Sequence, residues 1–265
     1  MNLAFAMPCA WSPRKERNKG NTYYWKGYKI FNCIAHTKRI SVCCSLDENV
    51  SKLETRILEW LQDSNNKDNK RLMIGLVGVP GSGKTTLASH TAARLNASRT
   101  GTCIVVPMDG FHYSKQTLAE MDNPAEAHAR RGAPWTFDSL GFIKALEKIR
   151  KKETVCLPWF DHHKGDPEEG AVYVDNLVPV VIVEGNYLLL PDKPWNTLPH
   201  ILDEIWYLDC EISEAMYRVF QRMVNDVGLS PGEASFRVSY NDSKNAEIIS
   251  SCKCRADVIL DSNSR

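Results

Sequence analysis

The sequence GVPGSGKT, residues 78–85, constrains the fold more than any other feature of the chain. It satisfies the pattern G-x-x-x-x-G-K-[ST], in which small residues let backbone N–H groups converge on phosphate oxygens. An apolar run of strand length, residues 71–78, precedes the loop, and a helical segment follows it. Because that helix directs its positive end at the loop, the motif predicts a nucleotide-binding site in an α/β fold.

The residues of this loop have separate expected roles. Lys84 is expected to reach the β- and γ-phosphates, and Thr85 to offer its hydroxyl to Mg²⁺. The Asn-Lys-x-Asp sequence that recognises guanine is absent, as is the signature of ABC-type ATPases, so we expect ATP and Mg²⁺. The predicted nucleotide-binding residues are Gly78, Pro80, Gly81, Ser82, Gly83, Lys84, Thr85 and Thr86.

Short apolar runs alternate with amphipathic segments along the rest of the chain. The run VPVVIVEG, residues 178–185, is continuously β-branched, which is typical of a strand buried on both faces. Further strands are predicted at residues 102–109, 205–209 and 256–260, a strand with a loop at its end at 154–163, and part of a hairpin at 171–176. This alternation predicts a P-loop NTPase three-layer α/β/α sandwich with a mostly parallel sheet.

The predicted helices have recognisable starts. Ser51 and Glu54 form a potential capping box for a helix over residues 51–63. Asp138 can cap a helix that ends near residue 151. That helix would bury Leu140, Ile143, Leu146 and Ile149 on one face, whereas residues 110–136 are predicted to be irregular. Two further helical regions are expected at 213–226 and, in two pieces, at 230–251.

Several acidic residues end the predicted strands. Ligands of parallel sheets gather at the carboxyl ends of the strands, where we expect Gly78, Asp109, Asp161, Glu184 and Asp209. Glu184 follows the most apolar strand, a Walker B-like position that suits a carboxylate bound to Mg²⁺ directly or through water. The alternative for Glu184 is an acid that caps the next turn.

Asp109 ends the strand that follows the P-loop helix. A right-handed crossover would make that strand a close companion of the first strand, with Asp109 near the γ-phosphate on the acceptor side. A carboxylate there can accept the proton of an attacking hydroxyl. Asp-Gly is also a common turn sequence, so a structural role is the alternative.

Four segments, in order, carry a resemblance to a known family. VPMDGFHYSKQTL, RRGAPWTFD, LPWFDHH and VVIVEGNYLLL resemble the phosphoribulokinase/uridine kinase family of P-loop kinases, over about residues 70–262. Within it the chain looks like the putative uridine kinase and ATP-dependent kinase-like branch, related to bacterial-type pantothenate kinases. The resemblance implies that Asp109 is the catalytic base, that Glu184 assists the metal, and that a helical lid covers the site.

The lid helix of the resembling family carries several arginines. This chain has Arg218 and Arg222, with Gln221, Asn225 and Asp226 beside them, so two of the family's arginines are replaced by amides. Arg218 and Arg222, four residues apart, share a helix face and can hold phosphate oxygens as charge develops. A solvated surface pair is the alternative.

Acceptor contacts are expected from residues 110–137 and the WFDHH loop. The candidate substrate-binding residues are His112, Tyr113, Arg130, Arg131, Asp161, His162 and Tyr173. The segment SYNDSKNAEII resembles a feature of the less characterised branch, in which Asn241, Asp242 and Asn245 would close over the nucleotide; their roles are left open.

These features favour an ATP-dependent kinase that phosphorylates a hydroxyl of a small metabolite. Nucleoside kinases of the family read Asp-x-Phe-Tyr and Tyr-Asp-x-x-x-His-x-Arg, and DGFHYS and WFDHHKGDP match these poorly. We therefore favour a sugar, a sugar-like alcohol or a pantothenate-like acid over uridine or another nucleoside. An ATP-binding regulatory or assembly protein with slow hydrolysis is the alternative of another class.

The first fifty residues differ in composition from the remainder. Residues 1–46 hold eight of the 33 Lys and Arg residues and one of the 32 acids, which leaves the remainder with a net charge of −6. We expect a transit peptide or disordered extension at 1–50, plastid import first and mitochondrion or cytosol as alternatives, and a kinase domain at 51–265. The acidic remainder argues against nucleic-acid binding, and no run of 18 apolar residues predicts a membrane span. Oligomeric state, monomer or homodimer, is left open.

Overall fold

The computed structural model describes residues 22–25, 28–31, 45–62, 70–161 and 164–262. Strands β1 (Thr22–Trp25) and β2 (Tyr28–Phe31) form an antiparallel pair within a first unit, residues 1–36. The second unit, residues 37–265, contains all the other elements. The expected transit peptide falls mostly on residues outside this description.

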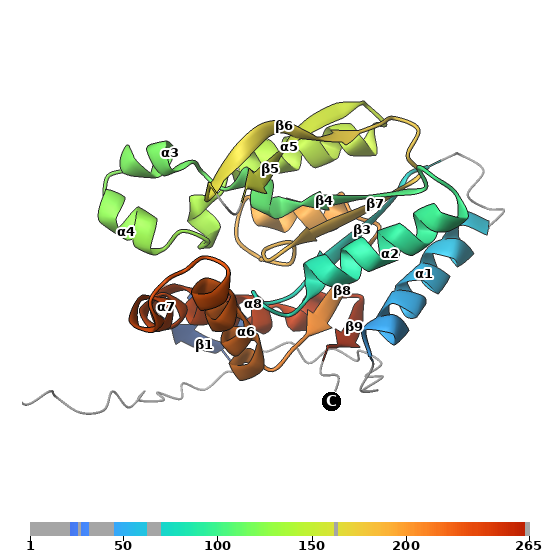
Figure 1. The fold of residues 1–265 in the computed structure, drawn as a ribbon. Coiled ribbons are helices and arrows are strands. Elements are labelled where there is room, and N and C mark those ends of the chain that lie inside the picture. Colours follow the sequence, from blue (N-terminus) through green and yellow to red (C-terminus); the bar gives the residue numbers. More distant parts are fainter. Residues whose placement is uncertain (1–21, 26–27, 32–44, 63–69, 162–163, 263–265) are drawn as a thin grey trace, which may run out of the picture. The chain divides into compact units, whose positions relative to one another are not determined.

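A five-stranded parallel sheet forms the centre of the second unit (Figure 1). Its strand order is β4-β7-β3-β8-β9. Strands β3 and β7 are buried along their whole length, as their continuous apolar sequences predict. The strands are β3 (Leu72–Val77), β4 (Cys103–Pro107), β7 (Val180–Gly185), β8 (Glu204–Asp209) and β9 (Val258–Asp261).

The position of β4 differs from the expected one. Strand β7 lies between β3 and β4, so the prediction that the strand before Asp109 neighbours the first strand is wrong. The handedness rule sets the direction of the crossover but not whether a later strand inserts into the gap. In the observed register Glu184 is opposite Leu76 on one side and Pro107 on the other. The insertion therefore places Glu184 between the strand that leads into the P-loop and the strand that leads to Asp109.

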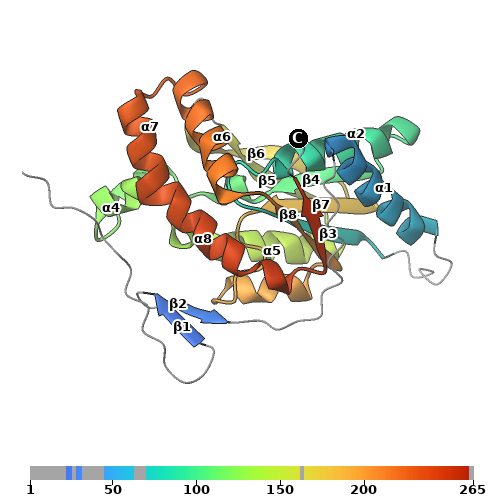
Figure 2. The same ribbon diagram turned by 90° about the horizontal axis from the view of Figure 1, so that it is seen from below.

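Helices cover both faces of the sheet, which confirms the three-layer prediction (Figures 1 and 2). Helices α1 (Leu46–Gln62) and α2 (Lys84–Ser98) pack on one face, against residues such as Ile74 and Leu76. Met73 and Val77 face the opposite core, to which α5 (Ser139–Arg150), α6 (Ile212–Asn225) and α8 (Ser243–Ser251) contribute. The alternation along β3 follows from the two-residue repeat of a strand.

Helix α1 begins earlier than predicted. Ser45 and Glu48 form the reciprocal cap, because the Glu48 carboxylate accepts from the Ser45 N–H (3.0 Å) and the Ser45 hydroxyl accepts from the Glu48 N–H (3.3 Å). Ser51 lies inside the helix and donates its hydroxyl to the Asp47 carbonyl at 2.8 Å. Ser45 and Ser51 both have an acid three residues on, so the local sequence did not decide between them.

Residues 110–137 are more regular than predicted. Two short helices, α3 (Lys115–Ala119) and α4 (Pro124–Ala129), follow a 3₁₀ turn at Met108–Phe111, and a second 3₁₀ turn spans Pro134–Thr136. Helix α5 then begins as expected, with the Asp138 carboxylate accepting from the Gly141 N–H at 2.9 Å. Leu140 is 59% exposed, which contradicts its predicted burial, and Phe142 takes its place in the core.

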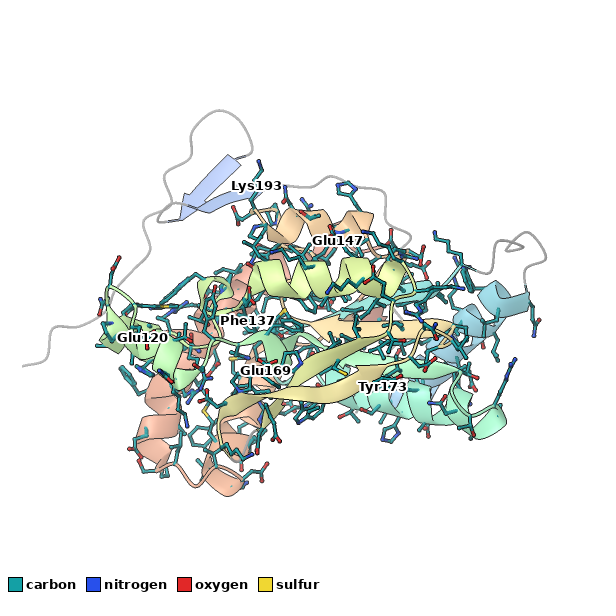
Figure 3. The ribbon with its side chains drawn as sticks, turned by 90° about the horizontal axis from the view of Figure 1, so that it is seen from above. Glu120, Phe137, Glu147, Glu169, Tyr173 and Lys193 are labelled. Carbon is teal, nitrogen blue, oxygen red and sulfur yellow. The ribbon has the colours of Figure 1, made fainter. Side chains whose placement is uncertain are left out.

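Strands β5 (Val155–Asp161) and β6 (Asp166–Val174) form the predicted hairpin as a separate antiparallel sheet. Figure 3 shows the ribbon of β6 with Glu169 and Tyr173 along it. Asp161 belongs to this hairpin, so the expectation that it lies at the carboxyl edge of the main sheet is wrong. An apolar run that ends in an acid does not reveal which sheet its strand joins.

The carboxyl-terminal part is mainly helical. Helix α7 (Pro231–Arg237) runs through a turn of π-helix, Val238–Asp242, into α8, which matches the predicted two helical pieces. Additional 3₁₀ segments are Trp195–His200 and Lys253–Arg255. Within the described ranges, none of the helices combines the length and apolar composition needed to cross a membrane.

Candidate active site

The P-loop connects β3 to α2 and lies against helix α6. Gly81 has a φ of +81° and Gly83 a φ of +93°, backbone conformations that glycine adopts without strain. A Cβ atom on Gly81 would lie 2.3 Å from the Ala215 carbonyl oxygen of α6. No side chain caps the start of α2, so its first N–H groups are available to an anion.

Glu184 lies at the end of β7, and its carboxylate is hydrogen-bonded to Thr85 of the P-loop motif. Its side chain is buried, with 4% of the residue exposed. The Thr85 hydroxyl lies 3.2 and 3.0 Å from its two carboxylate oxygens. The residues predicted to hold a metal therefore come together, and they present only oxygen atoms, the ligands that Mg²⁺ prefers. No group of three or more His, Cys, Asp or Glu side chains suited to a metal occurs in the described part of the chain.

Burial raises the pKa of the Glu184 carboxyl above its usual range. The Lys84 ammonium group opposes this increase, and the neighbouring Asp109 charge adds to it. Glu184 is thus within electrostatic reach of both Lys84 and Asp109, although the three residues come from different segments.

Asp109 lies in the 3₁₀ turn immediately after β4 rather than in the strand itself. A Cβ atom on Gly110 would come within 2.0 Å of the Pro158 carbonyl oxygen, so strand β5 packs directly on this turn. The Asp109 backbone carbonyl accepts from the His112 N–H at 3.1 Å. Among the described residues, no hydrogen bond to the Asp109 carboxylate is formed, which leaves its oxygens able to accept a proton.

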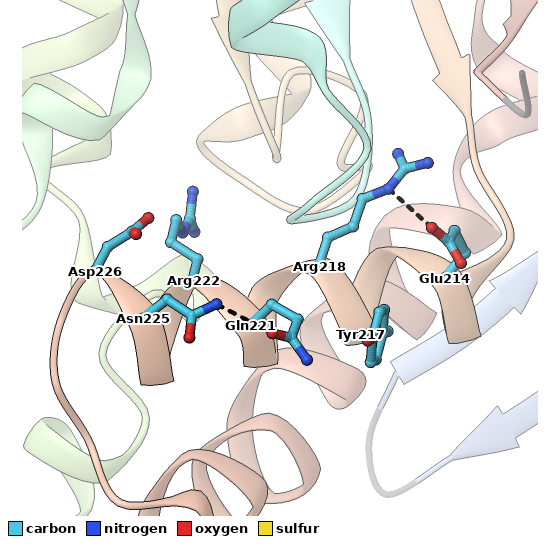
Figure 4. Close-up of a pocket in the computed structure, with 7 residues that line it drawn as sticks. All are labelled: Glu214, Tyr217, Arg218, Gln221, Arg222, Asn225 and Asp226. Carbon is cyan, nitrogen blue, oxygen red and sulfur yellow. Dashed lines mark hydrogen bonds and ion pairs between the residues drawn. The ribbon is translucent and has the colours of Figure 1, made fainter.

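Arg218 and Arg222 project from the same face of α6 (Figure 4). The Arg218 Nε donates to Glu214 at 3.1 Å, and its Nη1 lies 3.5 Å from the Gly81 carbonyl oxygen of the P-loop. Arg222 is exposed. Both arginines line a surface groove made by Glu214, Tyr217, Arg218, Gln221, Arg222, Asn225 and Asp226. Arg218 is therefore placed beside the loop, and Arg222 lies about one helical turn further along the same face.

Three of the predicted acceptor residues lie together. His112 packs between the rings of Phe137 and Phe160, at centroid distances of 4.0 and 4.8 Å. Arg131 donates to the Tyr113 carbonyl at 2.8 Å and to the Gly165 carbonyl, and its guanidinium lies over Phe160. Burial, and to a lesser extent the Asp138 charge, raises the pKa of the Tyr113 hydroxyl.

Arg130 makes a different set of contacts. Its Nη1 donates to the Tyr240 carbonyl at 2.7 Å and its Nη2 to the Asn245 side chain at 3.1 Å. Asn241 in turn donates to the Arg131 carbonyl at 2.9 Å. Two of the three residues of unassigned role, Asn241 and Asn245, thus connect to Arg130 and Arg131 of the predicted acceptor segment.

Comparison with known proteins identifies the chain's relatives. "Putative uridine kinase C227.14" of Schizosaccharomyces pombe is 40% identical over 200 residues, which cover 73% of this chain and 84% of the relative. The chain belongs to the uridine kinase-like family of P-loop kinases. "ATP-dependent kinase-like protein notR'" of Aspergillus versicolor is 36% identical over 149 residues, 54% of this chain and 86% of that protein. No family model matches the chain.

Solved structures agree with this assignment. The "putative fructose transport system kinase" from Silicibacter sp. TM1040 aligns with a TM-score of 0.70 and 35% identity, over 80% of this P-loop kinase and 98% of that chain. The predicted fold class and family resemblance are confirmed. As a member of the family, the protein is a phosphotransferase with an alcohol group as acceptor.

The remaining predicted residues of this P-loop kinase have different surroundings. Tyr173 is 57% exposed on β6, and Figure 3 shows it well separated from Phe137. Asp161 pairs with Lys164 in the hairpin turn at 3.5 Å. Asp209, expected at the carboxyl edge, is paired with Lys253 at 2.7 Å. His162 lies outside the described residues.

Two residues that contact the predicted acceptor segment were not among the candidates. Asp166 accepts from Arg131 at 2.6 Å, and Tyr187 donates its hydroxyl to the Gly132 carbonyl at 2.5 Å. Tyr187 lies in the VVIVEGNYLLL segment that carries the family resemblance, so a signal for it was present. Asp166 sits in a Gly-Asp-Pro sequence that is typical of any turn, so nothing local distinguished it.

Proposed function

We propose that the protein transfers the γ-phosphoryl group of ATP to a hydroxyl of a small metabolite. One observation carries the proposal: Asp109 and Glu184, from separate segments, converge next to Lys84 and Thr85 of the P-loop. The name of the Aspergillus versicolor relative, an ATP-dependent kinase-like protein, supports ATP as the donor.

The residues of the site have distinct roles in this reaction. Lys84 and the N-terminus of α2 bind the phosphates of ATP. Thr85 and Glu184 would hold Mg²⁺, which supplies charge neutralisation at the phosphates when bound. Asp109 accepts the proton of the attacking hydroxyl, and Arg218 and Arg222 stabilise the charge that develops on the transferred group. Positioning and electrostatics account for most of the rate enhancement in such reactions.

The acceptor is a sugar, a sugar-like alcohol or a pantothenate-like acid. The aromatic and cationic cluster of His112, Arg131 and Phe160 can contact a polar molecule beside Asp109. The relative whose structure aligns at 35% identity is named for fructose transport, which supports a sugar. Uridine is the second candidate, because the relative at 40% identity is named for uridine.

A panel of acceptors tests the proposal. Purified protein with ATP and Mg²⁺ would be offered ketoses, aldoses, polyols, D-glycerate, pantothenate and uridine, with ADP release as the readout. We expect one class to raise ADP release at least ~10²-fold above the rate without acceptor. If every acceptor and a whole metabolite extract leave ADP release at the water-driven rate, the proposed transfer is wrong and a regulatory protein is favoured.

We also propose import into plastids, on the basis of the basic, acid-poor sequence of residues 1–46. Sequencing the amino terminus of the mature protein tests this. A first residue near position 45 would support import with cleavage, and an intact Met1 would contradict it.

A further inference from the structure

Asp242 occupies an unusual position outside the proposed catalytic residues. It is the last residue of the π-helical turn between α7 and α8. Such turns are rare in proteins, and those that occur are often found at functional sites. Its Oδ1 accepts from the Asn241 side chain at 3.3 Å. Its Oδ2 is buried and has no hydrogen-bond partner in the part of the chain that the structure describes.

Three arginines from three different elements act on this carboxylate. Arg237 comes from α7, Arg222 from α6, and Arg130 from the end of α4. None of the three forms an ion pair with Asp242 at 4.0 Å or less among the described residues. Both terminal nitrogens of Arg130, Nη1 and Nη2, already donate to neutral groups. Arg222 and Arg237 are exposed and form no ion pair with any described residue.

The charge of Asp242 destabilises the arrangement seen here. Burial raises the pKa of the Asp242 carboxyl to about 6, although Arg237, Arg222 and Arg130 oppose the increase. Above that pH the carboxylate is ionised and buried without a direct cationic partner. Natural proteins retain such unfavourable groups mainly at functional sites, where another state of the protein uses them.

Arg237 has the largest effect of the three charges on Asp242 and Arg222 the next largest, but only Arg222 belongs to α6, the helix that packs on the P-loop. It shares a face of α6 with Arg218, which already contacts the P-loop carbonyl of Gly81, so a shift of α6 toward bound phosphate would carry Arg222 with it. The turn that holds Asp242 is tied to the acceptor segment through the Asn241 bond to Arg131. Asp242 thus lies where the lid helix and the acceptor segment meet.

We propose that Asp242 is a positioning residue. Its carboxylate forms an ion pair with Arg222 when helix α6 closes over a bound nucleotide, and this ion pair holds Arg222 against the phosphates. This inference rests on the proposed kinase function, because Arg222 needs a phosphate to act on. In this proposal Asp242 acts through Arg222 and not by contacting a substrate.

Hydrogen exchange of the full chain tests this without phosphoryl transfer. Exchange would be followed in the P-loop segment 78–88 and in 214–226 of α6, with and without Mg²⁺ and the β,γ-imido analogue of ATP. In the wild type we expect the analogue to slow hydrogen exchange in both segments. In Asp242→Asn and in Arg222→Gln we expect the analogue to slow hydrogen exchange only in 78–88. The double variant should behave like either single variant. Arg237→Gln, which removes the other exposed arginine, should behave as the wild type.

Two outcomes would overturn the inference separately from the proposed function. Two results would show that the ion pair between Asp242 and Arg222 does not form. In the first, the analogue slows hydrogen exchange in 214–226 of Asp242→Asn as much as in the wild type. In the second, this slowing is lost in Arg237→Gln and kept in Arg222→Gln. Absence of slowing at 78–88 in the wild type would overturn the proposed function itself, and the inference with it. The thermal midpoint without ligand distinguishes a structural role: at pH 8 we expect Asp242→Asn to melt no lower than the wild type, and a drop of several degrees would contradict the proposal.

Discussion

Substitution of Gly81 by alanine is expected to disturb the P-loop and the lid helix together. The added Cβ would lie 2.3 Å from the Ala215 carbonyl oxygen and 3.0 Å from the Val219 side chain, both on α6. Because real Cβ atoms stay beyond 3.0 Å, the backbone of α6 must retreat from the loop. Arg218, whose Nη1 lies 3.5 Å from the Gly81 carbonyl, would move with the helix.

The magnitude follows from two separate costs. An alanine at the φ of +81° costs about 1–2 kcal/mol, because its Cβ crowds the following carbonyl. Forcing two well-packed backbones apart adds about 1–3 kcal/mol. Gly101 provides the matched control, since its φ is +77° but a Cβ there meets nothing within 4 Å. Gly101→Ala should therefore cost only the first amount.

Urea denaturation of both variants measures the difference. We expect Gly81→Ala to lower the free energy of unfolding by about 2–5 kcal/mol and Gly101→Ala by about 1–2 kcal/mol. Gly81→Ala should also weaken binding of an ATP analogue, which Gly101→Ala should leave unchanged. Equal stability of the two variants would refute the packing of α6 on the loop that this account requires.

Three further predictions address other parts of the molecule. Glu184→Gln should reduce Mg²⁺-dependent turnover by at least ~10²-fold and leave metal-free binding of the ATP analogue unchanged, as titration calorimetry would show. Arg71→Met should lower the free energy of unfolding by about 3 kcal/mol or more in urea, because buried Arg71 donates at 2.7–2.8 Å to the carbonyls of Val178, Ile149 and Asp175. Asp242→Asn should be more stable than the wild type by up to about 3 kcal/mol at pH 8, because the folded wild type must then hold an ionised carboxyl whose pKa in the fold is about 6. This gap in the free energy of unfolding should close below the pKa of Asp242 in the unfolded chain, near pH 4. A gap that widens as the pH falls would contradict the raised pKa of Asp242.

The sequence predicted those elements whose conformation depends only on residues close by in the chain. The β-branched run of β7, the P-loop and the Asp138 cap each fix their own conformation from neighbouring residues. Helix α4 also carried a local signal, because Asn123 caps it and Pro124 opens it, but its six residues are too few to show a period. Short helices of this kind are easily taken for irregular chain.

Features that depend on distant residues were not predictable in the same way. The insertion of β7 between β3 and β4 joins segments about a hundred residues apart, and no local pattern encodes strand order. The pairing of Arg131 with Asp166 likewise depends on the hairpin packing against the acceptor segment. The sequence nevertheless indicated that Asp109 and Glu184 lie at one edge of the sheet, because each ends an apolar run and the carboxyl ends of parallel strands share one edge.

The substitution Asp109→Asn tests the central claim most directly. With the best acceptor from the panel, we expect turnover to fall by at least ~10²-fold while the dissociation constant of the ATP analogue changes by less than about twofold, because the amide cannot accept the hydroxyl proton. Asp122→Asn, a substitution at an exposed acid of the same segment, is the control. Turnover of Asp109→Asn equal to that of the control would contradict the assignment of Asp109 as the catalytic base.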